Sequence, residues 1–242
     1  MKSAWDRRIA RAQELTVRFP ESSNLLDFYR RILSFQQFVF ENLSSRAGTD
    51  VRAALRYLPP LIDLVRAHGP AKLAAYAILP DEIAGYWESG VQLDSEPLFF
   101  ARALLQPYAE WLAGRGTPQQ ETQQAVCPFC GGAPVAGVLR GEGDGAKRSL
   151  ICVMCATEWQ YRRIVCPKCG EQDKDKLPVY TAAEIDYVRV EACDACMTYI
   201  KSVDLTRNGH AVPAVDELAT VALNIWADER GYPKLETNLL GM

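Results

Sequence analysis

Residues 127–196 read CPFCGGAPVAGVLRGEGDGAKRSLICVMCATEWQYRRIVCPKCGEQDKDKLPVYTAAEIDYVRVEACDAC and contain every cysteine of the 242-residue chain. The eight cysteines form four C-x-x-C pairs, and the second two pairs repeat the first two about 40 residues later, which indicates a duplicated unit. A C-x-x-C pair turns both sulfurs toward one point, so two pairs joined by a hairpin predict a tetrahedral four-thiolate metal site. The predicted ligands are Cys127, Cys130, Cys152 and Cys155 in site 1, and Cys166, Cys169, Cys193 and Cys196 in site 2.

A disulfide framework or a redox-active dithiol is the main alternative to metal binding. The N-terminal stretch carries charges throughout and has no apolar core of a secretory signal, so we expect a cytoplasmic protein with reduced thiols. Disulfides within C-x-x-C pairs would also close very short loops and constrain little chain. A thioredoxin-like motif needs a helix directly after the pair, and Gly131-Gly132-Ala133-Pro134 argues against one. These observations favour two tetrahedral metal ions, each bound by four cysteines.

The spacing within each repeat favours ligand sets drawn from one repeat over a cross-braced arrangement. Each spacer is long enough for one hairpin, as zinc-ribbon and rubredoxin folds require. Glycine follows the first pair of each repeat, at Gly131 and Gly170, where a positive φ is expected, whereas Ala156 and Met197 follow the second pairs. A closed four-thiolate site accepts zinc or iron equally and leaves no open position for catalysis, so structural sites are favoured over direct metal chemistry.

The regions around the cysteines predict an α+β protein. Apolar residues at helical spacing indicate an all-helical domain over residues 1–113, followed by a polar linker at 114–126. Short strands and turn residues indicate two tandem rubredoxin-like or zinc-ribbon modules, at 127–165 and 166–207. Residues 213–230 predict a closing helix, and we expect it to pack back on the helical domain.

Charge argues against a nucleic-acid partner, and no apolar run is long enough for membrane insertion. The chain has a formal charge of −3, and residues 127–207 contain eleven Lys and Arg against eleven Asp and Glu. One local cluster, Trp159, Tyr161, Arg162 and Arg163, could stack on and pair with a partner. It also fits an ordinary strand with two solvated arginines, and that interpretation is slightly favoured.

The cysteine-rich segments resemble the FdhE family, the accessory proteins of formate dehydrogenase. The resemblance lies in residues 127–137, 150–159, 163–170 and 191–201, together with 213–219 and Gly231-Tyr232 near the C-terminus. It implies a cytoplasmic assembly factor that binds the catalytic subunit of a molybdenum or tungsten formate dehydrogenase. It also implies rubredoxin-like knuckles in which all eight cysteines are ligands, with iron as the usual metal.

No catalytic or nucleotide-binding motif occurs, and we do not expect an enzyme or any catalytic or cofactor-binding residue besides the metal ligands. Two other functions remain open from the sequence. A rubredoxin-like electron carrier or redox sensor would hold iron in one or both sites and would be coloured. A zinc-ribbon adaptor would bind an unrelated protein or, with strong salt dependence, a nucleic acid.

Overall fold

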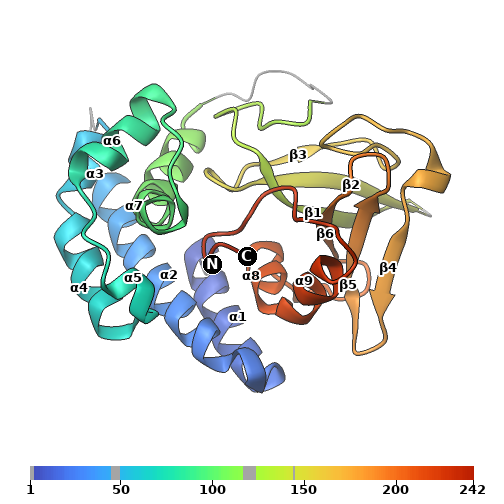
Figure 1. The fold of residues 1–242 in the computed structure, drawn as a ribbon, viewed down its shortest axis with the longest axis horizontal. Coiled ribbons are helices and arrows are strands. Elements are labelled where there is room, and N and C mark those ends of the chain that lie inside the picture. The colour runs from blue at the N-terminus through green and yellow to red at the C-terminus, as the bar shows by residue number, and fades with distance from the viewer. Residues whose placement is uncertain (1–2, 45–49, 117–123, 144) are drawn as a thin grey trace.

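A computed structural model describes residues 3–44, 50–116, 124–143 and 145–242. The helices of the N-terminal half lie on one side of the molecule and the strands on the other, with two C-terminal helices between them, and both termini lie near the centre (Figure 1). The N-terminal helices are α1 (Ala4–Arg18), α2 (Ser23–Ser44), α3 (Arg52–Leu55), α4 (Leu58–His68), α5 (Ala71–Ala74), α6 (Pro80–Ser89) and α7 (Ser95–Ala113), with a short 3-10 helix η1 (Pro20–Ser22) between α1 and α2.

The helical part forms around α2 and α7, which contact each other along their length. Helix α1 begins at a capping box in which Asp6 and Ser3 exchange side-chain and backbone hydrogen bonds, and it ends before Pro20. Helix α7 is buried on nearly all sides, because α2 and the short helices cover one side, and Arg102 and Gln106 bond to the C-terminal segment and to the turn after β2. The stacked rings of Phe28 and Phe99 are part of this core.

All six strands belong to one sheet, in the order β3-β2-β1-β6-β5-β4. Neighbouring strands pair antiparallel except β1 and β6, which run parallel and join the two cysteine repeats. The strands are β1 (Pro134–Glu142), β2 (Gly145–Cys152), β3 (Glu158–Gln160), β4 (Val179–Ala182), β5 (Ile185–Cys193) and β6 (Thr198–Asp204), with a 3-10 helix η2 (Lys174–Lys176) before β4.

The junction of β1 and β6 depends on a glycine. Gly137 pairs with Ser202, and a Cβ atom at Gly137 would collide with Ser202 Oγ and lie 3.1 Å from Ser202 Cβ. The absence of a side chain therefore lets the two strands approach. The sequence analysis identified hairpin strands within each repeat but did not identify β6, the strand that turns two modules into one sheet.

The closing segment consists of two helices, α8 (Pro213–Ala219) and α9 (Val221–Asp228), whereas one helix over 213–230 was expected. The break at Thr220 has a clear cause. Buried Lys201 on β6 donates hydrogen bonds from Nζ to the carbonyl oxygens of Glu217 (2.5 Å) and Thr220 (3.1 Å), and so ends α8. Helix α8 contacts α1, β1 and β6, with a buried Arg11–Asp216 ion pair linking it to α1.

The expected fold class is therefore confirmed: helices precede two ribbon modules, and the C-terminal helices return to the helical part. The proposed domain boundaries remain predictions, and most of the proposed linker, residues 117–123, lies outside the described residues. None of the helices in the described ranges has the length and apolar character needed to cross a bilayer.

Candidate metal centres

The first four-cysteine cluster, cage 1, forms at one end of the β1–β2 hairpin. Cys127 and Cys130 precede β1, Cys152 ends β2, and Cys155 lies in the turn before β3. The Sγ atom of Cys130 lies 3.4 Å from that of Cys152 and 3.5 Å from that of Cys155, and the Cys127 and Cys155 Sγ atoms are also 3.5 Å apart. All four Sγ atoms lie within 4.8 Å of one another.

The second cluster, cage 2, forms beyond the β4–β5 hairpin in the second repeat. Cys193 ends β5 and Cys196 precedes β6, while Cys166 and Cys169 come from the segment before η2. The Cys166–Cys196 and Cys169–Cys193 Sγ distances are both 3.7 Å, and all four Sγ atoms again lie within 4.8 Å of one another. The cysteines thus group within repeats, as the sequence predicts, and not across them.

These distances suit a tetrahedral metal ion. Bonds of about 2.3 Å from zinc to sulfur place the four sulfurs of a tetrahedron about 3.8 Å apart. Cage 2 matches this spacing closely, and cage 1 is a few tenths of an ångström tighter. All eight cysteines are free of disulfides. Each cluster could therefore hold a tetrahedral ion, and the geometry does not distinguish zinc from iron.

In three of the four knuckles a backbone N–H group points toward the sulfur of the first cysteine. The backbone N–H groups of Phe129, Met154 and Lys168 each donate to the Sγ of the cysteine two residues earlier, at 3.3 to 3.4 Å. Such bonds stabilise thiolates, because they place positive partial charge at the sulfur.

All four knuckles use the left-handed conformation at the residue after the second cysteine. Gly131 and Gly170 adopt φ of 72° and 78°, and Ala156 and Met197 adopt φ of 51° at the corresponding positions. They are the non-glycine residues with positive φ in the described part of the chain. The lack of glycine in the second knuckles is therefore accommodated by backbone strain, with the same turn geometry.

Two threonines that sequence reasoning missed complete the knuckles. The Thr157 and Thr198 Oγ1 atoms each lie 3.0 Å from the Sγ of the cysteine two residues earlier, Cys155 and Cys196. A hydroxyl at this distance donates a hydrogen bond to a thiolate. The repeated pattern C-x-x-C-x-T in both second knuckles was the signal that could have found them.

Exposure differs within each cluster. Cys127, Cys152 and Cys155 are buried in cage 1 and Cys130 is exposed, while cage 2 exposes Cys169. Burial raises the pKa of the Cys193 thiol to about 12, so a cation is needed to hold it as a thiolate at neutral pH. One cysteine of each cluster is thus exposed at the protein surface.

The proposed partner cluster separates into two parts. Trp159 and Tyr161 are buried, and the Trp159 Nε1 group donates to the Gln124 carbonyl at 3.0 Å. Both rings lie in the protein core, and their stacking on a partner stays a prediction beside the slightly favoured interpretation of an ordinary strand. Arg162 and Arg163 are exposed, as the alternative interpretation expected, and their role toward a partner stays a prediction.

A helical domain joined to a sheet with two four-cysteine clusters defines a class of protein with tandem rubredoxin-like or zinc-ribbon modules. Residues 126–163 match the FdhE central domain, and residues 152–240 match the FdhE C-terminal domain. A protein FdhE homologue of Aquifex aeolicus is 30% identical over 94% of this chain and 92% of its own length. The chain belongs to the FdhE family.

Two further comparisons agree with this assignment. A protein FdhE homologue of Pseudomonas aeruginosa is 35% identical over 152 residues, which cover 59% of this chain and 48% of that relative. The crystal structure of the FdhE protein from Pseudomonas aeruginosa superposes with a TM-score of 0.75 at 24% identity, over 99% of this chain and 96% of that chain. The solved structure therefore shares the whole fold.

Proposed function

We propose that this protein is a cytoplasmic assembly factor that binds the catalytic subunit of a molybdenum or tungsten formate dehydrogenase during its maturation. The observation that carries the proposal is family membership over nearly the whole chain, at 30% identity to an FdhE homologue. The family name implies an accessory role toward that enzyme. A chain with closed four-thiolate clusters fits a binding function better than catalysis, because a closed site offers no position to a substrate.

In this proposal the eight cysteines of cages 1 and 2 bind two metal ions, one in each cage. A bound ion would supply a cross-link between the two knuckles of each repeat, and its binding free energy would stabilise ribbons too small to fold by apolar burial alone. The family resemblance favours iron, and the geometry accepts zinc equally. Metal analysis and the visible spectrum of anaerobically purified protein distinguish the two.

The decisive experiment is an anaerobic, reducing pull-down of the tagged chain from a host that expresses formate dehydrogenase. We expect enrichment of the catalytic subunit, identified by mass spectrometry. A tagged chain with Cys127 and Cys130 replaced by serine serves as the control, because loss of cage 1 should abolish capture. If the catalytic subunit is absent from the wild-type sample, the assembly-factor proposal is wrong.

Exposure of one cysteine in each cage supports a second candidate, an electron carrier or redox sensor. Cys130 and Cys169 reach the surface, which shortens the path from a bound iron to a redox partner. This function requires visible absorption that bleaches reversibly with a reductant. A colourless protein that contains two equivalents of zinc would exclude it.

A further inference from the structure

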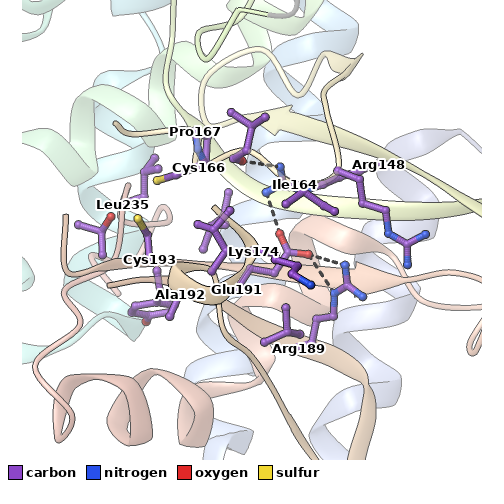
Figure 2. Close-up of a pocket in the computed structure, with 17 residues that line it drawn as sticks. Arg148, Ile164, Cys166, Pro167, Lys174, Arg189, Glu191, Ala192, Cys193 and Leu235 are labelled. Atoms are coloured by element: carbon purple, nitrogen blue, oxygen red, sulfur yellow. Dashed lines mark hydrogen bonds and ion pairs between the residues drawn. The ribbon is translucent and has the colours of Figure 1, made fainter. Parts of the chain in front are cut away.

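A cavity of about 300 Å³ lies beside cage 2, where Cys166 and Cys193 form part of its wall (Figure 2). Strands β2, β5 and β6 contribute one side, and the segments 163–167 and 174–179 contribute the other. A volume of this size is at the lower end for sites that bind small ligands or single side chains. Among its lining residues, the sequence analysis had identified the metal ligands Cys166 and Cys193 and the possible partner residue Arg163.

The polar side of the cavity is built around one carboxylate and two guanidinium groups. Arg148 and Arg189 approach Glu191 from two directions, at 2.7 Å and 2.6 Å (Figure 2). Arginine stays protonated in proteins, so both guanidinium groups carry a full positive charge. Because they share one carboxylate, Glu191 neutralises only one of the two arginines.

One hydrogen-bond donor of Arg148 has no acceptor among the described residues. Its side chain is 2% exposed, and its Nε atom has no hydrogen-bond partner. A buried, unpaired charged donor is costly, and a ligand or a water that reached it would recover part of that cost.

Two more cations line the cavity at its rim. Arg163 and Lys174 are exposed, and neither forms an ion pair with a carboxylate of the described residues. The cavity thus has four cationic side chains and one carboxylate, although the whole chain has a net charge of −3. Four thiolates around a divalent ion would give cage 2 a net charge of −2, so the cationic excess lies at the rim, at Arg163 and Lys174, and favours an anionic group there.

The remaining wall is apolar and open at its edge. Ile164 and Val179 are 52% and 51% exposed, large values for aliphatic side chains that flank a cavity. Behind them the wall is completed by Val165, Pro167, Leu177, Ile200 and Leu235. An exposed aliphatic rim suits the side chain of a protein segment, which would cover Ile164 and Val179, better than a small ligand enclosed in the cavity.

We propose that this cavity binds an acidic peptide segment of the client protein, with an aliphatic side chain between Ile164 and Val179 and a carboxylate between Arg163 and Lys174. The identity of the client rests on the proposed function. Because Cys166 and Cys193 form part of the wall, a metal ion in cage 2 would fix the shape of the site. Two arginines were proposed from the sequence as possible partner-binding residues. Of these, Arg163 lines the cavity and Arg162 does not.

The test uses the metal-loaded full-length chain and two variants with the same change in charge. Arg163→Glu/Lys174→Glu reverses the rim, whereas Arg162→Glu/Lys176→Glu reverses neighbouring exposed cations that do not line the cavity. Metal content and thermal unfolding establish that both variants are folded. Binding of the purified formate dehydrogenase catalytic subunit is measured by biolayer interferometry, and overlapping peptides of that subunit locate the bound segment by fluorescence anisotropy.

We expect the rim variant to bind the subunit and its best peptide at least about tenfold more weakly, because two favourable charge contacts become repulsive. The matched variant should stay within about twofold of wild type. Ile164→Ser should weaken binding of the same peptide, and Ile225→Ser, an equally exposed isoleucine on α9, should not. The best peptide should contain Asp or Glu. The same peptide with Asn or Gln in place of that residue should bind more weakly.

Three outcomes would overturn the proposal. If wild type and the rim variant bind the subunit equally, the client docks elsewhere while the assembly function stands. If the best peptide is basic or lacks an acidic residue, the assigned chemistry is wrong. If wild-type protein does not bind the subunit at all, the proposed function fails together with this site, a result distinct from the first.

Discussion

Cage 1 lies against the N-terminal helices, whereas cage 2 lies against the C-terminal segment. Gln106 on α7 donates to the Val153 carbonyl at 2.8 Å, and the Tyr86 hydroxyl on α6 lies 3.6 Å from the Met154 sulfur, both within the second knuckle of cage 1. In cage 2 the knuckle residue Asp194 accepts a 2.5 Å hydrogen bond from the Tyr232 hydroxyl.

Backbone hydrogen bonds add to the contact between cage 2 and the C-terminal segment. Tyr199 on β6 donates to Pro233 at 3.1 Å and accepts from Leu235 at 2.8 Å, so the C-terminal segment follows the strand that leaves cage 2. The two clusters therefore share their turn geometry and ligand type but connect to different parts of the molecule. The four-cysteine cluster is repeated in the chain, but the segments that pack against each copy differ.

The largest difference between the two cages should appear when each is removed. We expect Cys127→Ser/Cys130→Ser and Cys166→Ser/Cys169→Ser each to reduce bound metal from two ions to one. Metal binding in isolated structural knuckles is worth about 10 kcal/mol or more, so the affected ribbon should unfold. Loss of cage 1 should also lower the melting temperature of the helical part, because Gln106 and Tyr86 lose their partners.

Metal analysis, circular dichroism and limited proteolysis measure these effects. Cleavage in the cage 2 variant should begin in the segment after residue 205 and in the β4–β5 hairpin, while the N-terminal helices stay protected. Retention of two ions by either variant would contradict the ligand assignment. Equal destabilisation of the helices by both variants would contradict the difference in surroundings.

A second prediction concerns the buried lysine that fixes β6 to α8. Lys201 is fully buried, lies 3.1 Å from a carboxylate oxygen of Glu217, and shares that carboxylate with Lys234. We expect Lys201→Met to reduce the free energy of unfolding by about 3 kcal/mol, because it leaves carbonyl groups of α8 without a donor and weakens the charge pairing of Glu217. Urea unfolding measures the change, and an unchanged midpoint would contradict it.

The same lysine gives a pH dependence with a defined sign. Desolvation lowers the pKa of Lys201 to about 8, from 10.5 in the unfolded chain. Between these values the unfolded chain binds more protons at this group, so its contribution makes the free energy of unfolding rise with pH. We expect the pH slope of wild type between about pH 8 and 10 to exceed that of Lys201→Met. Equal slopes would show that Lys201 does not titrate in this range.

The third prediction tests the junction between the two repeats. Gly137→Ala should cost about 1–3 kcal/mol, because the new methyl group collides with Ser202 where β1 and β6 run parallel. Adding Ser202→Gly should recover part of the loss. Gly141→Ala is the matched control in the same strand, since its nearest neighbour is Thr206 Cγ2 at 3.9 Å. Thermal unfolding measures all three, and equal effects at Gly137 and Gly141 would exclude a steric junction.

The smallest expected effect compares the knuckles themselves. Ala156→Gly and Met197→Gly should each stabilise the protein by about 0.5–1 kcal/mol, because glycine adopts positive φ without strain. Gly131→Ala and Gly170→Ala should each destabilise it by about 1–2 kcal/mol for the opposite reason. Metal release by a chelator at increasing temperature reports on each cage. A stabilising effect of Gly131→Ala would show that the four turns are not equivalent.

The metal clusters and most helices could be predicted from the sequence because their signals are local. Pro20 follows the end of α1, Pro59 and Pro60 lie in the first turn of α4, and Gly69 follows its last residue, and each of these signals can be read from the sequence alone. Short elements are harder to delimit: α3 covers only Arg52–Leu55, and β3 covers only Glu158–Gln160. Elements of three or four residues are not stable alone, so tertiary contacts decide where they begin and end.

The sequence by itself determined that two clusters of four cysteines form, because C-x-x-C spacing brings two sulfurs together within one turn and a hairpin brings two such turns together. The tertiary structure alone decided that β1 pairs with β6, that Lys201 divides the closing segment into α8 and α9, and that Trp159 and Tyr161 are buried. These features depend on contacts between segments that are far apart in the sequence and meet only after folding. The cationic cavity beside cage 2 is such a surface, since its walls come from strands β2, β4, β5 and β6, from the segments before β4, and from Leu235 near the C-terminus.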